Sequence, residues 1–212
     1  MCVDASLLGV VEAVIDDVAT TIEGIIVLGD VPSGSALPGK TRLVSYESLI
    51  GAEPQSFDWP TFDENTASSL CYTSGTTGNP KGVLYSHRST VLHAWSLAMP
   101  DTVGIRAVDV ILPIVPMFHV NAWGTPYAAA MTGATMAMPG PRLDGASLHK
   151  LIWEAGVTYA AGVPTVWLGL QQHLRATNGT LPAGLRGLVG GFMMPRCLTK
   201  EIRPNPSLLT CC

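Results

Sequence analysis

Short apolar runs alternate with longer amphipathic stretches along most of the chain. From residue 68 onward the apolar runs predict strands, and between them apolar residues recur at helical spacing. The expected strands are 68–73, 82–86, 109–115, 134–138, 157–161 and 186–190, and the expected helices are 88–99, 122–132, 145–155 and 164–175. Strands that alternate with helices predict an α/β fold in which helices cover both faces of a sheet.

The N-terminal part also shows a helical pattern followed by a strand pattern, with fewer elements. Residues 4–18 carry apolar positions at helical spacing, and the apolar run 25–28 is typical of a buried strand. Residues 30–40 and 51–65 are rich in Pro, Gly and polar residues, which predicts loops. The last ten residues, RPNPSLLTCC, resemble neither an expected helix nor an expected strand.

Charge and hydropathy exclude two classes of partner. The net charge of -4 is spread without blocks of one sign, so the chain offers no basic stripe for nucleic acid or anionic lipid. Residues 110–141 contain no Asp, Glu, Lys or Arg and are long enough to cross a bilayer. Five prolines and three glycines interrupt that stretch, which favours several elements of a buried core over a membrane helix.

The cysteines indicate the compartment. Their number is odd, and Cys2, Cys71, Cys197, Cys211 and Cys212 form no CxxC pair or zinc-type cluster with histidine. This usage is typical of a reducing environment. The N-terminus has no signal-peptide pattern, because Asp4 stands where positive charge is needed. We therefore expect a cytoplasmic protein without a transmembrane segment; its oligomeric state cannot be predicted.

The stretch YTSGTTGNPKG (72–82) concentrates groups that bind phosphate. Glycines allow backbone N–H groups to converge, the hydroxyls donate hydrogen bonds, and a lysine adds positive charge; these residues are Thr73, Ser74, Gly75, Thr76, Thr77, Gly78 and Lys81. The common GxxxxGK[ST] loop does not match, because Pro80 precedes the lysine and an apolar run follows it. From composition alone, a plain turn of a hairpin is an equally good interpretation.

The same stretch resembles the signature loop of the adenylate-forming (AMP-binding) superfamily, which includes acyl-CoA synthetases. Further segments resemble that family in the expected order: PMFHVNAWG (116–124), PGPRLDGASL (139–148), AGVPTVWLGL (161–170) and LVGG (188–191). The likeness is strongest to ligases that join fatty acids or methylthiopropionate to coenzyme A. It implies that residues 1–212 form part of the large N-terminal domain of that fold, with mixed sheets covered by helices.

The resemblance implies a two-step chemistry. Members of the family use ATP and Mg²⁺ to convert a carboxylic acid to an acyl adenylate, and then transfer the acyl group to coenzyme A. Thr73, Ser74, Gly75, Thr76, Thr77, Gly78 and Lys81 would bind the nucleotide phosphates, with Thr76 close to the metal ion. His119, Trp123, Val163, Pro164, Thr165, Gly190 and Gly191 would line the acid site. No residue of the chain is assigned as a catalytic acid or base.

Several matching positions have a plainer interpretation. A histidine among apolar residues, as at 119, is more often a packed core residue, and only the resemblance favours substrate binding. Trp167, Leu170 and Leu174 are expected to be packing residues, because they recur at helical spacing. Asp101, Asp109 and Asp144 are expected in solvated loop or capping roles. His87, His93, His149 and His173 show no metal-binding spacing, so no metal site is predicted from them.

Other segments of the family are not found in these 212 residues. We find neither a YGxTE-like segment with its Mg²⁺-binding glutamate, nor the TGD segment, nor the small C-terminal domain with its lysine. We therefore expect an incomplete adenylation domain that is inactive by itself. The alternative is a catalytically inactive nucleotide- or acyl-binding fragment, or a truncated gene product.

Overall fold

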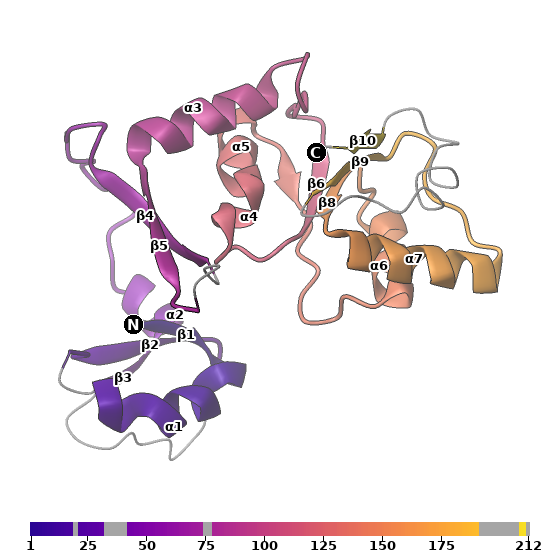
Figure 1. Cartoon of the computed structure of the whole chain (residues 1–212). Coiled ribbons are helices and arrows are strands. Elements are labelled where there is room, and N and C mark those ends of the chain that lie inside the picture. The colour runs from indigo at the N-terminus through magenta and orange to yellow at the C-terminus, as the bar shows by residue number, and fades with distance from the viewer. Residues whose placement is uncertain (19–20, 32–41, 74–77, 191–207, 211–212) are drawn as a thin grey trace. The chain divides into compact units, whose positions relative to one another are not determined.

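Three sheets organise the part of the chain that the structure describes (Figure 1). The computed structural model describes residues 1–18, 21–31, 42–73, 78–190 and 208–210. The chain divides into two compact units, residues 1–61 and 62–212. Each unit has its own hydrophobic core, so each is described by itself.

The first unit is a small parallel sheet with one long helix. Strands β1 (Cys2–Asp4), β2 (Gly24–Leu28) and β3 (Arg42–Ser45) pair in that order, and α1 (Leu8–Val18) follows the short 3-10 helix η1 (Ala5–Leu7). Helix α2 (Tyr46–Ile50) follows β3. The predicted helix and the strand at 25–28 are confirmed. β1, β3 and α2 were missed, because elements of three to five residues are too short to show a period.

The second unit begins with an antiparallel hairpin. Strand β4 (Ala67–Thr73) pairs with β5 (Lys81–Ser86), and Thr73 lies opposite Lys81. Helix α3 (His87–Ala98) starts directly after β5, where Ser86 and Ser89 form a capping box. Both predicted strands are confirmed. The residues between them therefore join two antiparallel neighbours, as a hairpin requires.

A five-stranded parallel sheet forms the centre of the second unit. Its order is β10 (Leu208–Thr210), β9 (Arg186–Val189), β8 (Tyr159–Gly162), β6 (Val110–Ile114) and β7 (Thr135–Met136). The connections contain α4 (Val120–Trp123), α5 (Thr125–Thr132), α6 (Gly145–Glu154) and α7 (Pro164–Thr177). The α/β class expected from the sequence is confirmed.

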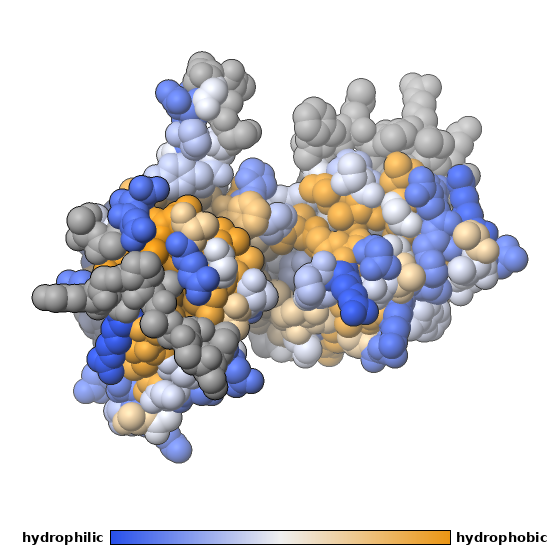
Figure 2. Space-filling view, turned by 90° about the horizontal axis from the view of Figure 1, so that it is seen from below, coloured by the Kyte–Doolittle hydropathy of each residue, from blue (hydrophilic) through white to orange (hydrophobic). Residues whose placement is uncertain are grey.

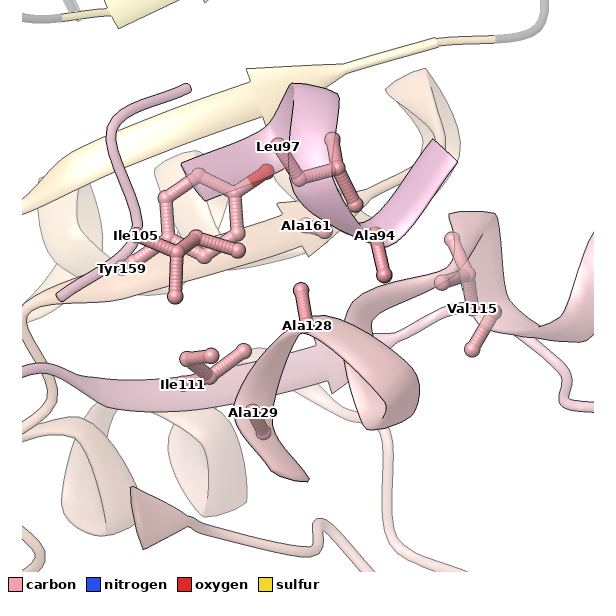
Figure 3. Packing of buried hydrophobic residues seen from close by; sticks show 10 residues of the cluster. Ala94, Leu97, Ile105, Ile111, Val115, Ala128, Ala129, Tyr159 and Ala161 are labelled. Atoms are coloured by element: carbon pink, nitrogen blue, oxygen red, sulfur yellow. The ribbon is translucent and has the colours of Figure 1, made fainter. Parts of the chain in front are cut away.

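Helices cover both faces of this sheet because its strands are apolar on both sides. Ile111 of β6 and Tyr159 of β8 pack against α3 and α5, together with Leu97 and Ala128 (Figure 3). The intervening residues point the other way. Among them, Leu112 packs with residues of α6 and α7, including Ile152, Trp167 and Leu170. The expected packing role of Trp167 and Leu170 is confirmed by exposed fractions of 1% and 2%.

Two expectations about elements are wrong. The helix expected over 122–132 begins only at Thr125, because Gly124 has φ +72° and separates it from the turn before it. The last ten residues, in which no strand was expected, contain β10. Its pairing with β9 depends on a neighbour distant in sequence, so local pattern does not reveal it. Among the described residues, no helix is long and apolar enough to cross a membrane.

Asp109 is buried immediately before β6, which corrects the expectation of a solvated loop or capping role. Its carboxylate lies 2.7 Å from Nη2 of Arg186 and 3.6 Å from Nη2 of Arg106, and it accepts a hydrogen bond from Thr158 Oγ1 at 2.9 Å. Arg186 also donates to the carbonyl of Val103. The residue before β6 and the first residue of β9 are therefore held together through one ion pair.

Burial by itself raises the pKa of Asp109. Hydrogen bonds from the Arg106 amide, Thr158 and Arg186, together with the charge of Arg186, outweigh burial and lower the pKa below its ordinary value. A carboxyl with a lowered pKa contributes stability above the pKa it has in the unfolded chain. That contribution is lost as the pH falls through the pKa of the folded state.

We predict that Asp109→Asn lowers the free energy of unfolding at pH 7 by about 3 kcal/mol, because it leaves the Arg186 charge without its partner. The difference from the unsubstituted chain should begin to shrink as the pH falls below about 4, the ordinary pKa of an aspartate, and should disappear as the pH falls through the lowered pKa of the folded state, where the native carboxyl becomes protonated. Urea unfolding followed by circular dichroism measures both. Asp101→Asn, at an exposed position, is the control and should change little; a pH-independent difference at Asp109 would contradict the account.

Candidate nucleotide and acid site

The hairpin places the described residues of the signature loop at the end where its two strands are connected. Thr73 is the last residue of β4, and Lys81, which is exposed, is the first of β5; Thr73 Oγ1 donates to the Lys81 carbonyl at 3.4 Å. Gly78 has φ +92°, a conformation that side chains rarely adopt. The remaining predicted loop residues lie outside the described residues, as does Gly191: these are Ser74, Gly75, Thr76 and Thr77.

The predicted acid-binding residues lie at one edge of the five-stranded sheet. Because β6, β8 and β9 are parallel, their carboxyl ends meet at the same edge. His119 follows β6, Val163 follows β8, and Gly190 follows β9. The chain continues from β6 to β7 on one side and then returns to β8 on the other. Such a reversal of strand order is where α/β sheets bind ligands.

Trp123 and Gly190 meet at this edge. A Cβ atom at Gly190 would lie 2.9 Å from Cη2 of Trp123, which is closer than real Cβ atoms come. The indole ring thus lies over the end of β9 in a space that only glycine leaves free. Two segments separated by 66 residues, which the sequence predicted to share a site, are in contact.

The segment that carries Trp123 has an unusual backbone. Val120, Asn121, Ala122 and Trp123 all have φ between +50° and +55°, so α4 is a left-handed turn. For residues other than glycine this conformation costs about 1–2 kcal/mol each, and for a branched residue such as valine it is rarer still. Strain of this kind persists only where surrounding contacts hold it, and it is concentrated at functional sites.

Side chains from three directions hold the left-handed turn. Asn121 Nδ2 donates to Ser69 Oγ at 2.8 Å, and the free thiol of Cys71 donates to Asn121 Oδ1 at 3.3 Å. His93 Nε2 lies 3.2 Å from the Trp123 carbonyl, and Thr125 Oγ1 donates to the Ala122 carbonyl at 2.8 Å.

Asn121 therefore connects the sheet edge with strand β4. Ser69 and Cys71 alternate with Thr73 along that strand, so the strand bonded to Asn121 is the one that ends at the signature loop. Sequence reasoning missed Asn121. No periodicity or motif spacing marks a residue whose partners lie about 50 positions away in the sequence.

His119 and the start of α7 complete the edge. His119 is exposed and is the N-cap residue of α4, without a side-chain capping bond. Val163 caps α7 and is partly buried, Pro164 follows at the first helical position, and Thr165 is exposed. The packed-core interpretation of His119 is therefore wrong. The structure leaves His119 and Thr165 accessible at the edge where the resemblance predicts the acid.

Apolar side chains are also exposed beside the edge. Met117 and Phe118 precede His119, and Met138 and Leu143 follow β7; their exposed fractions lie between 46% and 78%. Figure 2 shows apolar surface on the part of the molecule that contains the five-stranded sheet with α6 and α7. Asp144 has the expected capping role, since its carboxylate accepts bonds from the amides of Ser147 and Ala146 at the start of α6.

A parallel sheet with candidate ligand residues at the carboxyl ends of its strands is the arrangement by which open α/β folds bind ligands. Residues 11–206 match the model of the AMP-binding enzyme family. The chain belongs to this family.

Curated relatives agree in sequence. The chain is 59% identical over 170 residues to a medium-chain-fatty-acid–CoA ligase of Ectopseudomonas oleovorans, with 80% of this chain and 30% of the relative covered. It is 49% identical to a 3-methylmercaptopropionyl-CoA ligase of Ruegeria pomeroyi, with 94% of this chain and 37% of the relative covered. The chain thus spans about a third of the length of these relatives.

Solved structures agree in fold. An inhibitor-bound N-terminal domain of FACL13 from Mycobacterium tuberculosis matches with a TM-score of 0.69 at 26% identity, covering 95% of this chain and 52% of that one. The anthranilate CoA ligase AuaEII, solved with anthranoyl-AMP, matches with a TM-score of 0.76 at 21% identity, covering 99% of this chain and 39% of that one. The expected fold class, α/β with mixed sheets that form part of the large N-terminal domain of the adenylate-forming fold, is confirmed.

We predict that Gly190→Ala lowers the free energy of unfolding by about 1–3 kcal/mol, because the new methyl group overlaps the Trp123 ring. In a Trp123→Ala background the same change should cost much less, since the ring is gone. Urea unfolding of the four chains of this double-mutant cycle measures the coupling. Gly184→Ala, where nothing lies within 4 Å of the added atom, is the matched control. Equal costs in both backgrounds would contradict the contact.

We also predict that Asn121→Ala destabilises the second unit by about 1–3 kcal/mol, because it removes the two hydrogen bonds that join the left-handed turn to Ser69 and Cys71 of β4. Hydrogen exchange of the amides in 119–125 should rise before global unfolding. Asn65→Ala removes an exposed asparagine that bonds only locally and serves as the control. Unchanged protection of 119–125 in Asn121→Ala would show that other contacts fix the turn.

Proposed function

We propose that this chain forms the phosphate- and acid-binding part of an ATP-dependent acyl-CoA synthetase. The observation that carries the proposal is the Asn121 bridge. It joins the strand leading into the signature loop to the turn that holds Trp123 against Gly190. A nucleotide phosphate at the signature loop and an acid beside Trp123 would lie close enough to react.

The hairpin end would bind the phosphates of ATP. Lys81 would neutralise phosphate charge, and Thr73 with the hydroxyls of Ser74, Thr76 and Thr77 would donate hydrogen bonds. Gly75 and Gly78 would let backbone amides approach. Mg²⁺ bound with the nucleotide, near Thr76, would supply further charge neutralisation at the phosphates. Through these contacts the chain would orient pyrophosphate as the leaving group.

The sheet edge would bind the acid. His119 would orient the carboxylate, Trp123, Val163 and Pro164 would contact its chain, Thr165 would add a hydroxyl, and Gly190 with Gly191 would leave room for the adenylate. The relatives named for medium-chain fatty acids and for methylmercaptopropionate support an aliphatic acid as substrate. The exposed apolar residues beside the edge support the same class.

The reaction proposed has two steps. A carboxylate oxygen attacks the α-phosphorus of ATP, and the bond to pyrophosphate breaks. The thiol of coenzyme A then attacks the acyl carbon, and AMP leaves. The described residues would contribute to the first step by positioning the reactants and by stabilising the charge that develops on the phosphates. The cytoplasmic location and the reducing environment remain predictions from the cysteines and the N-terminus.

Isothermal titration calorimetry with two ligands tests the proposed phosphate site and the proposed acid site separately. We predict that Lys81→Ala weakens MgATP binding about tenfold or more, because one charge-assisted contact is lost, and leaves an alkyl sulfamoyl adenosine nearly unaffected. That adenylate mimic has no β- or γ-phosphate. Trp123→Ala should weaken binding of the alkyl sulfamoyl adenosine and leave MgATP binding nearly unaffected, because it removes contact with the alkyl chain and not with the phosphates.

The controls are an exposed lysine and an exposed tryptophan on other elements. Lys150→Ala on α6 and Trp95→Ala on α3 should leave both affinities unchanged. If Lys81→Ala weakens both ligands equally, or neither, the assignment of the hairpin end to the phosphates is wrong. Acid-dependent exchange of pyrophosphate into ATP, if it disappears in Lys81→Ala, would assign turnover to this chain; binding without exchange would support the alternative of a non-catalytic binding protein.

A further inference from the structure

Two histidines from neighbouring helices face each other away from the acid site. His149 lies on α6 and His173 on α7, and both are half-buried. Nδ1 of His149 is 3.3 Å from Nε2 of His173, with ring centroids 5.3 Å apart and planes inclined by 60°. They are 24 residues apart in sequence, so the spacing of histidines could not reveal the pair.

The tautomer of His149 follows from its other nitrogen. Nε2 lies 2.9 Å from the carbonyl oxygen of Thr180 and 3.2 Å from the indole Nε1 of Trp153. A carbonyl oxygen can only accept, and a lone pair on Nε2 would face the lone pairs of that oxygen, so we assign the proton to Nε2. The indole Nε1 of Trp153 donates to the same oxygen at 2.9 Å. Nδ1 of His149 therefore presents a lone pair toward His173. Metal-bound histidines are held in the same way, by donating their second N–H to a backbone carbonyl.

The separation of the two nitrogens suits a metal ion. Two imidazole nitrogens at about 2.0–2.1 Å from a tetrahedral zinc ion are roughly 3.3 Å apart. The pair has this separation already, so an ion could enter between the nitrogens with small ring movements. Among the described residues no group of three or more His, Cys, Asp and Glu side chains could hold a metal, so water would fill the other positions.

The surroundings favour a transition metal over magnesium or calcium. Imidazole nitrogen suits zinc, nickel and copper, whereas magnesium and calcium require oxygen ligands. The two charged residues of α6, Lys150 and Glu154, pair with each other at 3.8 Å.

We propose that His149 and His173 form a two-histidine site for a divalent transition metal that ties α6 to α7. The site is independent of the proposed function, because it uses no residue of the hairpin or the sheet edge. Its structural effect would be local. A bound ion would hold the last turns of α7 and residues 178–180 against α6, beside the existing Trp153–Thr180 bond.

Nickel titration of the tag-free chain tests the proposal. We expect Ni²⁺ to raise the melting temperature of the chain, because it binds the folded state, and we expect EDTA to reverse this increase. His149→Gln and His173→Gln should each weaken Ni²⁺ binding about tenfold or more, since each removes half of the protein ligands. His87→Gln is the matched control, because it leaves the pair intact. Comparing variants with identical cysteines removes the contribution of thiols.

A second measurement needs no substitution. In long-range ¹H–¹⁵N spectra, Zn²⁺ should shift two of the five imidazoles and leave the other three in place. Affinities equal within about twofold for the unsubstituted chain and both variants, or zinc shifts absent from His149 and His173, would overturn the proposal. These results would leave the affinities for MgATP and the alkyl sulfamoyl adenosine untouched, so the two proposals fail separately.

Discussion

The left-handed turn from Val120 to Trp123 is the constraint on which the site depends. Its backbone is unfavourable for four consecutive residues, so the turn exists only because Asn121, His93 and Thr125 hold it. By forming, it points His119 outward and lays the Trp123 ring over Gly190. A right-handed continuation into α5 would direct these side chains elsewhere. The cost of the turn is thus offset by contacts that also join the hairpin to the sheet edge.

The five-stranded sheet and the helices packed on it support the left-handed turn. The five-stranded sheet is packed on both faces, and the buried Asp109–Arg186 pair fixes the opposite ends of its strands. The carboxyl edge can then carry exposed polar and apolar side chains without loss of the core. The acid-binding residues proposed here accordingly follow the strands of this sheet, and the core residues Ile111, Leu112 and Tyr159 lie within them.

Local pattern predicted the elements well where they were long. The strand at 68–73 and the helices at 145–155 and 164–175 were predicted within two residues at each end. It failed at β10, which depends on a distant partner, and at 122–124, where tertiary contacts override helix propensity. The candidate site was predicted from family-like motifs. Its connecting residue Asn121, the buried state of Asp109 and the His149–His173 pair were not, because each arises from contacts between distant segments.

A crystal structure of this chain with an alkyl sulfamoyl adenosine bound tests the central claim most directly. The account predicts that the adenosine lies beside the end of β9 at Gly190, that the sulfamoyl group lies near His119, and that the alkyl chain contacts Trp123. It also predicts that Asn121 keeps its bonds to Ser69 and Cys71. A ligand bound elsewhere, or a turn at 120–123 that has become right-handed, would contradict the account.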